Sequence, residues 1–273
     1  MGKFDGIYLV SDLDGTLLSS NAYGVSEENI AAIKYFMAEG GRFGFATGRT
    51  VNELYELNEL IGTNAPSITC NGTEIYDFST GESRIIDEAK EDILPFLDYV
   101  VNEYPNVMIE MVSDSDIYYY RPNSSLEKHK SITNSHFREI SHYSLIPHPW
   151  MKIAIWDEAE AIKKFAETVD RSKLPENYNF MYSFKYCCEI STFTADKGVA
   201  LLEAKNQQNG ICKAVAIGDN ENDVLMLKNA DISFVPSNAV PMAKECADII
   251  LDADCNNSAV ALAIKKLEEM IFS

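Results

Sequence analysis

Residues 7–16 read Ile-Tyr-Leu-Val-Ser-Asp-Leu-Asp-Gly-Thr, a short apolar run that ends in two carboxylates. The apolar part predicts a buried strand. Because side chains alternate along a strand, Asp12 and Asp14 are expected on the same side where the chain leaves it, and Gly15 lets backbone N–H groups come close to a ligand. Two such carboxylates repel each other unless a cation or a shared proton intervenes, and hard oxygen ligands suit Mg²⁺. The stretch therefore predicts a magnesium site at the end of a strand.

Strands and helices alternate in the first and last parts of the chain. Ser26 is expected to cap a helix after the first strand, and the same alternation returns after residue 190. This pattern is typical of an α/β fold, in which helices cover both faces of a parallel sheet. The expected strands span residues 7–12, 42–47, 67–70, 73–76, 214–217, 232–235 and 249–251.

The middle of the chain has a different texture. Helical patterns at 88–104 and 157–169 are interleaved with strand-like stretches. We interpret residues 83–189 as an α+β domain inserted into one α/β domain, which residues 1–82 and 190–273 form together. An insertion at the active edge of a sheet can exclude water and contact a leaving group, so substrate specificity is expected there.

Polar residues also break three other apolar runs at strand or helix ends. Thr47-Gly48-Arg49 follows the second strand and offers a hydroxyl group at a helix start, where anions bind readily. Lys197 adds a cation, while Asp219 and Asp223 add oxygen ligands or hold such ligands through hydrogen bonds. Taken singly, these are ordinary turns, caps or a solvated lysine. Reactive groups gather at the carboxyl ends of strands in such sheets, so their shared location favours one site.

The chain of 273 residues has 42 Asp and Glu residues against 23 Lys and Arg residues, a net charge of −19. Nucleic acids and anionic membranes are disfavoured partners, because both attract basic surfaces. No run approaches the roughly 18 apolar residues of a membrane span, and the N-terminus lacks a secretory pattern. We therefore expect a cytoplasmic protein with no obligate protein partner. Its six cysteines form no C-x-x-C pair and are expected to be reduced core thiols.

Four segments in order resemble the motifs of the haloacid dehalogenase (HAD) superfamily. They are residues 12–16, 46–49, 197–198 and 218–227. Asn71-Gly72 before a strand, together with the long insertion, resembles the Cof-type phosphatases, which carry a type IIB cap. The resemblance spans the whole chain and implies a Rossmann-like, HAD-like parallel-sheet core with an inserted α+β cap domain.

The resemblance also implies catalytic roles. Family members attack phosphorus with the first aspartate, here Asp12, and form an aspartyl-phosphate that water hydrolyses. The second aspartate, here Asp14, would serve as general acid and then as general base. The implied Mg²⁺ ligands are the Asp12 carboxylate, the Asp14 backbone carbonyl and Asp219, with Asp223 behind them. The groups that would bind the phosphoryl oxygens are Thr47, Lys197, Asn222 and backbone N–H groups near Leu13 and Gly48.

We therefore expect a Mg²⁺-dependent phosphatase of small phosphorylated metabolites. Sugar phosphates are the preferred substrate class, and nucleotide or cofactor monophosphates come second. A phosphomutase or phosphotransferase with the same nucleophile is an alternative, and detection of released phosphate separates them. A non-hydrolytic signalling module of the receiver type is an alternative of a different class. Receiver domains are about half this length and carry no insertion, and a true dehalogenase lacks the aspartate that Asp14 provides.

Overall fold

The computed structural model describes residues 2–20, 24–113, 116–131, 133 and 135–272. Its contacts divide the chain into two compact units, each of which is described by itself. We call them the core, residues 1–49, 54–86 and 196–273, and the inserted domain, residues 50–53 and 87–195. No helix within the described residues is long and apolar enough to cross a membrane.

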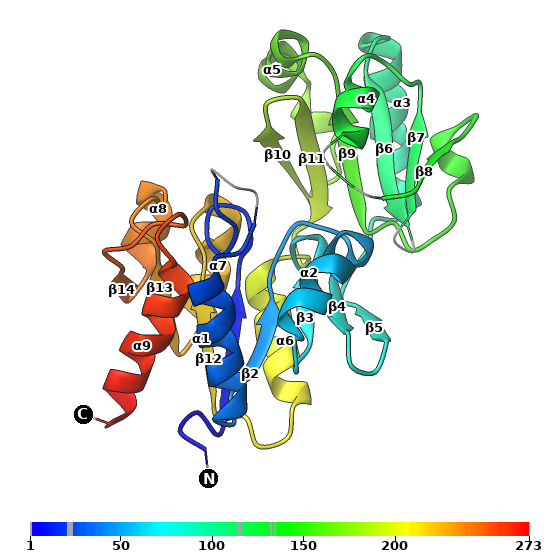
Figure 1. Ribbon diagram of the computed structural model, residues 1–273. Helices are drawn as coiled ribbons and strands as arrows, with labels where there is room; N and C mark the ends of the chain where they lie inside the picture. The colour runs from blue at the N-terminus through cyan, green and yellow to red at the C-terminus, as the bar shows by residue number, and fades with distance from the viewer. Residues whose placement is uncertain (1, 21–23, 114–115, 132, 134, 273) are drawn as a thin grey trace. The chain divides into compact units, whose positions relative to one another are not determined.

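The core is built on a parallel sheet of five strands, in the order β14-β13-β12-β1-β2 (Figure 1). Ser11 at the end of β1 pairs with Ile217 of β12 on one side and with Phe45 of β2 on the other. The three strands thus end at the same level, and the residues that follow them emerge at one edge of the sheet. The strands span Ile7–Ser11 (β1), Arg42–Phe45 (β2), Lys213–Ile217 (β12), Ile232–Val235 (β13) and Ile249–Ile250 (β14).

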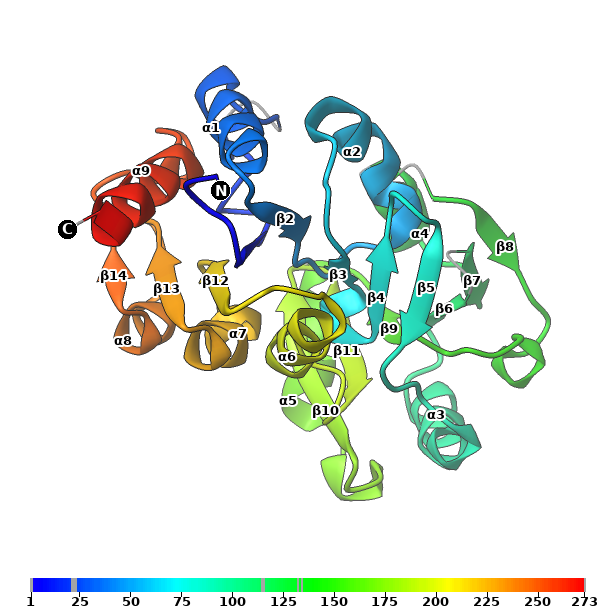
Figure 2. The same cartoon turned by 90° about the horizontal axis from the view of Figure 1, so that it is seen from below.

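Helices cover both faces of this sheet (Figure 2). Leu9 packs with α1 and α9 in one apolar cluster, whereas Tyr8 and Val10 pack with α6, α7 and α8 in another. Alternate residues of β1 therefore face opposite layers, as the period of a strand requires. The helices are Glu27–Ala38 (α1), Lys197–Gln207 (α6), Val224–Asn229 (α7), Pro241–Cys246 (α8) and Ala259–Phe272 (α9).

A small antiparallel sheet completes the core beside β2. Its strands are β3 (Ser67–Thr69), β4 (Glu74–Asp77) and β5 (Glu82–Ile85), and helix α2 (Tyr55–Ile61) precedes them. A short 3₁₀ turn, Cys70–Gly72, links β3 to β4. The predicted domain boundaries at 82 and 189 stay predictions. In the structure, the inserted domain begins after residue 86 and ends at residue 195. Strand β5 belongs to the core because it pairs with β4, and Asp196 belongs to the core because it caps α6.

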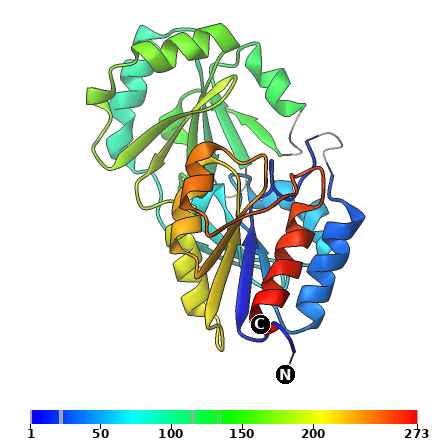
Figure 3. The same ribbon diagram turned by 90° about the vertical axis from the view of Figure 1, so that its left-hand side faces the viewer.

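The inserted domain is a mixed sheet of six strands, in the order β10-β11-β9-β6-β7-β8. Only β7 and β8 among these neighbours run parallel. Helices α3 and α5 pack on one face of the sheet (Figure 3), and Leu126 of α4 packs against the other. The elements are Leu94–Glu103 (α3), Met108–Ser113 (β6), Asp116–Tyr120 (β7), Ser125–Lys130 (α4), Phe137–Glu139 (β8), Lys152–Trp156 (β9), Ala159–Thr168 (α5), Tyr178–Phe184 (β10) and Cys187–Thr192 (β11).

The predicted fold class, an α/β parallel-sheet core with an inserted α+β domain, is confirmed. Some predicted elements were wrong in detail. The helix expected to start after Thr47-Gly48-Arg49 begins as a 3₁₀ turn, Val51–Leu54, and becomes α-helical only at Tyr55. The helix expected from residue 88 likewise starts with a 3₁₀ turn, Glu91–Ile93. Of the six cysteines, four are buried, whereas Cys212 is exposed and Cys246 is partly buried.

Candidate active site

Three carboxylates meet at the carboxyl edge of the core sheet. Asp12 directly follows β1, and Asp219 and Asp223 belong to the loop and 3₁₀ turn after β12. One oxygen from each lies within 4.8 Å of the others, and all three residues are buried. The three carboxylates lie close together because β1 and β12 end side by side. The pairing continues one residue past β1, since Asp12 N–H donates to the Ile217 carbonyl at 2.9 Å.

Lys197 supplies a buried positive charge to this cluster. Its Nζ donates to Asp12 Oδ1 at 2.7 Å and to Asp223 Oδ1 at 2.6 Å. The first turn of α6 holds the lysine in place, because Asp196 Oδ1 accepts hydrogen bonds from the N–H groups of Gly198 and Val199. The prediction that placed Lys197 at a helix start therefore matches its place in the fold.

The charges in this cluster do not balance, because three carboxylates face one ammonium group. Burial raises the pKa of Asp12 well above its usual value, and the charge of Asp223 adds to the effect against the lowering by Lys197. Burial also raises the pKa of Asp219 to about 6, although Thr16 lowers it. Burial lowers the pKa of Lys197, but Asp12 and Asp223 outweigh it, so its pKa is raised. The buried excess of negative charge and the all-oxygen donor set fit a divalent cation such as Mg²⁺.

The residues after Asp14 shape the same cluster. Thr16 Oγ1 donates to Asp219 Oδ1 at 2.7 Å. Gly15 has a φ of +90°, and a Cβ at this position would lie 2.5 Å from Asp219 Oδ2. Only glycine therefore fits between the loop and Asp219, which gives the Asp-x-Asp-Gly-Thr stretch its physical reason.

Asp14 lies differently from the expectation that it shares one side with Asp12. Its carboxylate is exposed and accepts two hydrogen bonds from Arg49, while no oxygen of Asp14 is among those of the acidic cluster. The strand ends at Ser11, so the alternation that placed the two carboxylates together does not extend to Asp14. Leu13 between them is fully buried in the core.

The loop after β2 joins the site through Asn71. Thr47 is buried, and its Oγ1 accepts a hydrogen bond from Arg49 N–H at 3.2 Å. A Cβ at Gly48 would lie 2.9 Å from Asn71 Oδ1, the same oxygen that accepts a hydrogen bond from Asn222 Nδ2 at 2.9 Å. Residues predicted to bind phosphate from two separate loops are thus brought together by one amide side chain.

Sequence reasoning missed the part played by Asn71 and Arg49. It used Asn71-Gly72 only as a turn before a strand and as part of the family resemblance, and it assigned no role to Arg49. Cys70, Asn71 and Gly72 all have positive φ, at 47°, 56° and 102°. Two consecutive non-glycine residues in this region are unusual, and such backbone strain is found preferentially at functional sites. Asparagine before glycine was the available signal, since asparagine tolerates this conformation.

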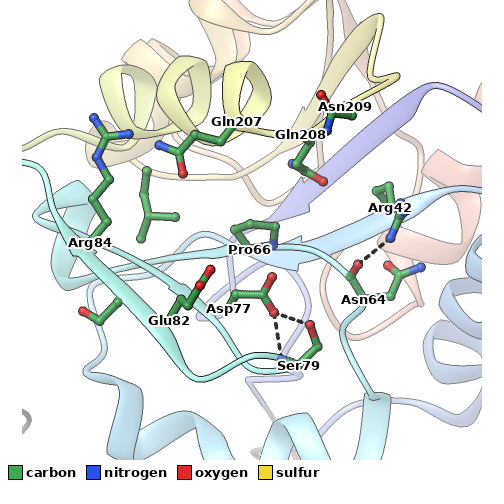
Figure 4. Close-up of a pocket in the computed structure, with 12 residues that line it drawn as sticks. Arg42, Asn64, Pro66, Asp77, Ser79, Glu82, Arg84, Gln207, Gln208 and Asn209 are labelled. Atoms are coloured by element: carbon green, nitrogen blue, oxygen red, sulfur yellow. Dashed lines mark hydrogen bonds between the residues drawn. The ribbon is translucent and has the colours of Figure 1, made fainter.

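A separate cavity of about 690 Å³ lies between the β4–β5 hairpin and the end of α6 (Figure 4). Gln207 and Gln208 line one side of it, and Asp77 and Glu82 line the other. None of the residues predicted to bind metal or phosphate contributes to its lining. The cavity therefore does not coincide with the acidic cluster.

The chain matches the model of one protein family. The family of haloacid dehalogenase-like hydrolases matches residues 9–264 of this chain. The 5-amino-6-(5-phospho-D-ribitylamino)uracil phosphatase YcsE of Bacillus subtilis (strain 168) is 26% identical over 257 residues, which cover 93% of this chain and 92% of the relative.

Solved structures show the same fold. A haloacid dehalogenase-like hydrolase from Bacteroides thetaiotaomicron has a TM-score of 0.81 at 24% identity and covers 95% of this chain and 98% of its own. The HAD subclass IIB sugar phosphatase BT4131 has a TM-score of 0.76 at 21% identity, with coverage of 95% and 98%. Because the family model covers residues 9–264, the chain belongs to the Cof-type branch of the haloacid dehalogenase superfamily of hydrolases.

Proposed function

We propose that the chain is a Mg²⁺-dependent phosphatase of small phosphorylated metabolites, with sugar phosphates as the first substrate class. The chief support is that Lys197, fully buried, donates hydrogen bonds to Asp12 and Asp223 beside a third buried carboxylate. A buried lysine is costly unless it has such partners, and here it holds one oxygen of Asp12 in a fixed direction. A fixed, partly neutralised carboxylate is what a phosphorus-directed nucleophile requires.

In the proposed reaction, an oxygen of Asp12 attacks phosphorus, an O–P bond forms, and the bond from phosphorus to the leaving oxygen breaks. Asp14 donates its proton to that leaving oxygen. Asp14 then takes a proton from water, whose oxygen attacks the phosphorus of the aspartyl-phosphate. The bond between phosphorus and Asp12 breaks, which releases phosphate and restores both carboxyl groups.

The cation would be held by the Asp12 carboxylate, the Asp14 backbone carbonyl and Asp219. When bound, Mg²⁺ offsets the charge of the carboxylates and of the phosphoryl group. Asp223 supports this arrangement from behind, since its Oδ2 accepts hydrogen bonds from the N–H groups of Asp219 and Asn220 at 2.8 and 3.0 Å. Such outer contacts orient ligands and are expected to matter nearly as much as the ligands themselves.

The phosphoryl oxygens need local donors, because a chain of net charge −19 repels an anionic substrate as a whole. We propose Thr47, Lys197 and Asn222 with the N–H groups of Leu13 and Gly48 for this task. These donors would act on the phosphoryl oxygens over a few ångströms, which is well inside a Debye length of about 8 Å. Solvent ions screen the repulsion from distant carboxylates more strongly, so the donors can outweigh it. The phosphatase names of similar proteins support a phosphorylated substrate.

The test is release of inorganic phosphate from a panel of sugar phosphates, nucleotides and cofactor monophosphates, with Mg²⁺ and again with a chelator. We expect Mg²⁺-dependent release, and we expect Asp12→Asn to reduce it by about a thousandfold or more without unfolding. Asp231→Asn, which alters an aspartate paired with Lys205 outside the site, is the matched control and should keep wild-type turnover. Comparable activity in Asp12→Asn and the wild type would exclude the mechanism, and transfer without phosphate release would indicate a phosphotransferase.

A further inference from the structure

Arg49 holds the Asp14 carboxylate with two parallel hydrogen bonds. Its Nη2 donates to Asp14 Oδ1 at 2.6 Å, and its Nε donates to Oδ2 at 3.0 Å. Both oxygens of the carboxylate are therefore engaged on one planar group. Such a bidentate pair fixes the orientation of a carboxylate as well as its position, which a single contact cannot do.

The backbone on the arginine side of this pair is itself anchored. The N–H group of Arg49 donates to Thr47 Oγ1 at 3.2 Å, and its carbonyl accepts from Cys70 N–H at 3.0 Å. Thr47 N–H in turn donates to the Ile68 carbonyl at 2.9 Å. The arginine side chain thus starts from a backbone position that β3 and the turn after it hold in place.

The aspartate side is anchored as well. The Leu13 carbonyl accepts hydrogen bonds from the N–H groups of Thr16 and Leu18, at 3.2 and 2.8 Å. The Gly15 carbonyl accepts one from Asn238 Nδ2 at 2.8 Å. The two loops that carry the pair are therefore each fixed before their side chains meet.

Stability does not account for this arrangement. The side chains of Arg49 and Asp14 are 34% and 62% exposed, and exposed ion pairs contribute only about 0–1 kcal/mol to folding. The orientation has a clearer consequence for the acidic cluster, which already carries three carboxylates against one lysine. A fourth carboxylate turned inward would add like charge there and compete for a cation as a side-chain ligand.

We infer that Arg49 is a positioning residue for Asp14. It keeps the Asp14 carboxylate outside the acidic cluster and in one orientation. The positioning stands on the geometry of the pair alone. Its effect on turnover rests on the proposed function, in which Asp14 exchanges protons with the leaving oxygen and with water.

The first test is structural and needs no activity. Crystal structures of the wild type, Arg49→Met and Arg42→Met would be compared with and without Mg²⁺. Arg42 lies at the other end of β2, where its Nη1 donates to the Asn64 carbonyl, and serves as the matched control. We expect the Asp14 carboxylate to leave its orientation only in Arg49→Met. An unchanged Asp14 orientation in that variant would overturn the inference.

The second test is kinetic. We expect Arg49→Met to lower kcat about 10- to 100-fold with a change in KM below about threefold, because misplacing a reacting group slows chemistry more than binding. Arg49→Lys should recover part of the kcat lost in Arg49→Met, because lysine keeps the positive charge. The recovery should be incomplete, because an ammonium group cannot form the planar, two-contact pair of a guanidinium group. Arg42→Met should match the wild type.

A double variant separates positioning from direct substrate binding. If Arg49 acts through Asp14, then Asp14→Asn with Arg49→Met should be no slower than Asp14→Asn alone. A loss that persists in the Asp14→Asn background, or one that falls mainly on KM, would show that Arg49 binds substrate and would overturn the inference. Absence of phosphate release by the wild type would instead refute the proposed function, and the crystal structures would still decide the positioning.

Discussion

The Nζ of Lys197 lies 2.7 Å from an oxygen of Asp12, and both groups are buried although 185 positions separate them in the chain. This contact joins the residue that follows the first strand of the core to the first helix after the insertion. It neutralises part of a cluster whose other members, Asp219 and Asp223, carry further negative charge. The charge balance of the site therefore depends on the buried ammonium group of Lys197. The first prediction concerns the removal of this group.

Lys197→Met should destabilise the fold and abolish turnover. Removing one partner of a buried ion pair leaves its carboxylates uncompensated and costs about 3–5 kcal/mol. Urea unfolding measures this loss. The control is Lys205→Met, since the side chains of Lys205 and Asp231 are 21% and 42% exposed and their pair should contribute no more than about 1 kcal/mol. Equal unfolding midpoints for the two variants would contradict the prediction.

Gly72→Ala should damage both stability and activity, whereas Gly81→Ala should affect stability only. Both glycines have positive φ, at 102° and 75°, which costs a residue with a Cβ about 1–2 kcal/mol. A Cβ at Gly72 would also lie 2.2 Å from the backbone of Asp196, which caps the helix of Lys197, whereas Gly81 has open space. We expect phosphate release to fall at least about tenfold in Gly72→Ala alone. Wild-type turnover in that variant would show that the close approach is not needed.

Mg²⁺ should raise the melting temperature of the wild type. A cation that binds only the folded cluster stabilises it by about 2.7 kcal/mol at a hundred times its dissociation constant. The shift should disappear in Asp219→Asn and persist in Asp77→Asn, since Asp77 lines the separate cavity of Figure 4. Differential scanning fluorimetry with a Mg²⁺ titration measures both. An equal shift in the two variants would place the cation elsewhere.

The inserted domain should lose stability in acid through Glu88. Burial raises the pKa of Glu88, but hydrogen bonds from Lys90, His148 and Trp150 N–H outweigh it and lower that pKa below 4.5. A carboxylate whose pKa is lowered on folding stabilises the protein above its unfolded pKa, and this stabilisation is lost as pH falls through the folded value. Glu88→Gln should therefore be less stable than the wild type near pH 7, by about 1 kcal/mol at most, and the difference should close in acid. Chemical unfolding across pH measures it, with Glu160→Gln, at an exposed position of α5, as the control variant.

Local patterns were enough to predict most of the core. A short apolar run predicted β1, and the Ser26 side chain accepts a hydrogen bond from Asn29 N–H as its predicted cap role requires. Strand β5 was missed, because Glu-Ser-Arg-Ile at 82–85 is a mostly exposed edge without a buried alternation. Helix α4 and strand β8 were missed because they lie in a polar stretch whose pairing with β7 is set by tertiary contacts.

The candidate site divides in the same way. Asp12, Asp219 and Asp223 interrupt apolar runs at strand ends, so the rule about carboxyl edges was sufficient to group them. The direction of the Asp14 side chain was not predictable, because it depends on the Arg49 rotamer rather than on the strand period. The position of Asn71 depends on consecutive left-handed backbone angles, which sequence spacing does not encode.

The strand order of the core also bears on how the polypeptide matures during translation. Because β1 lies between β2 and β12, its second neighbour leaves the ribosome only after the whole insertion has been synthesised. Residues 87–195 are contiguous and can fold early. The edge of β1 that later pairs with β12 lacks its hydrogen-bond partner until β12 has been synthesised. We therefore expect nascent chains halted before residue 213 to need chaperone protection. We also expect the late synthesis of β12 to set the rate at which Asp12 gains its buried neighbours.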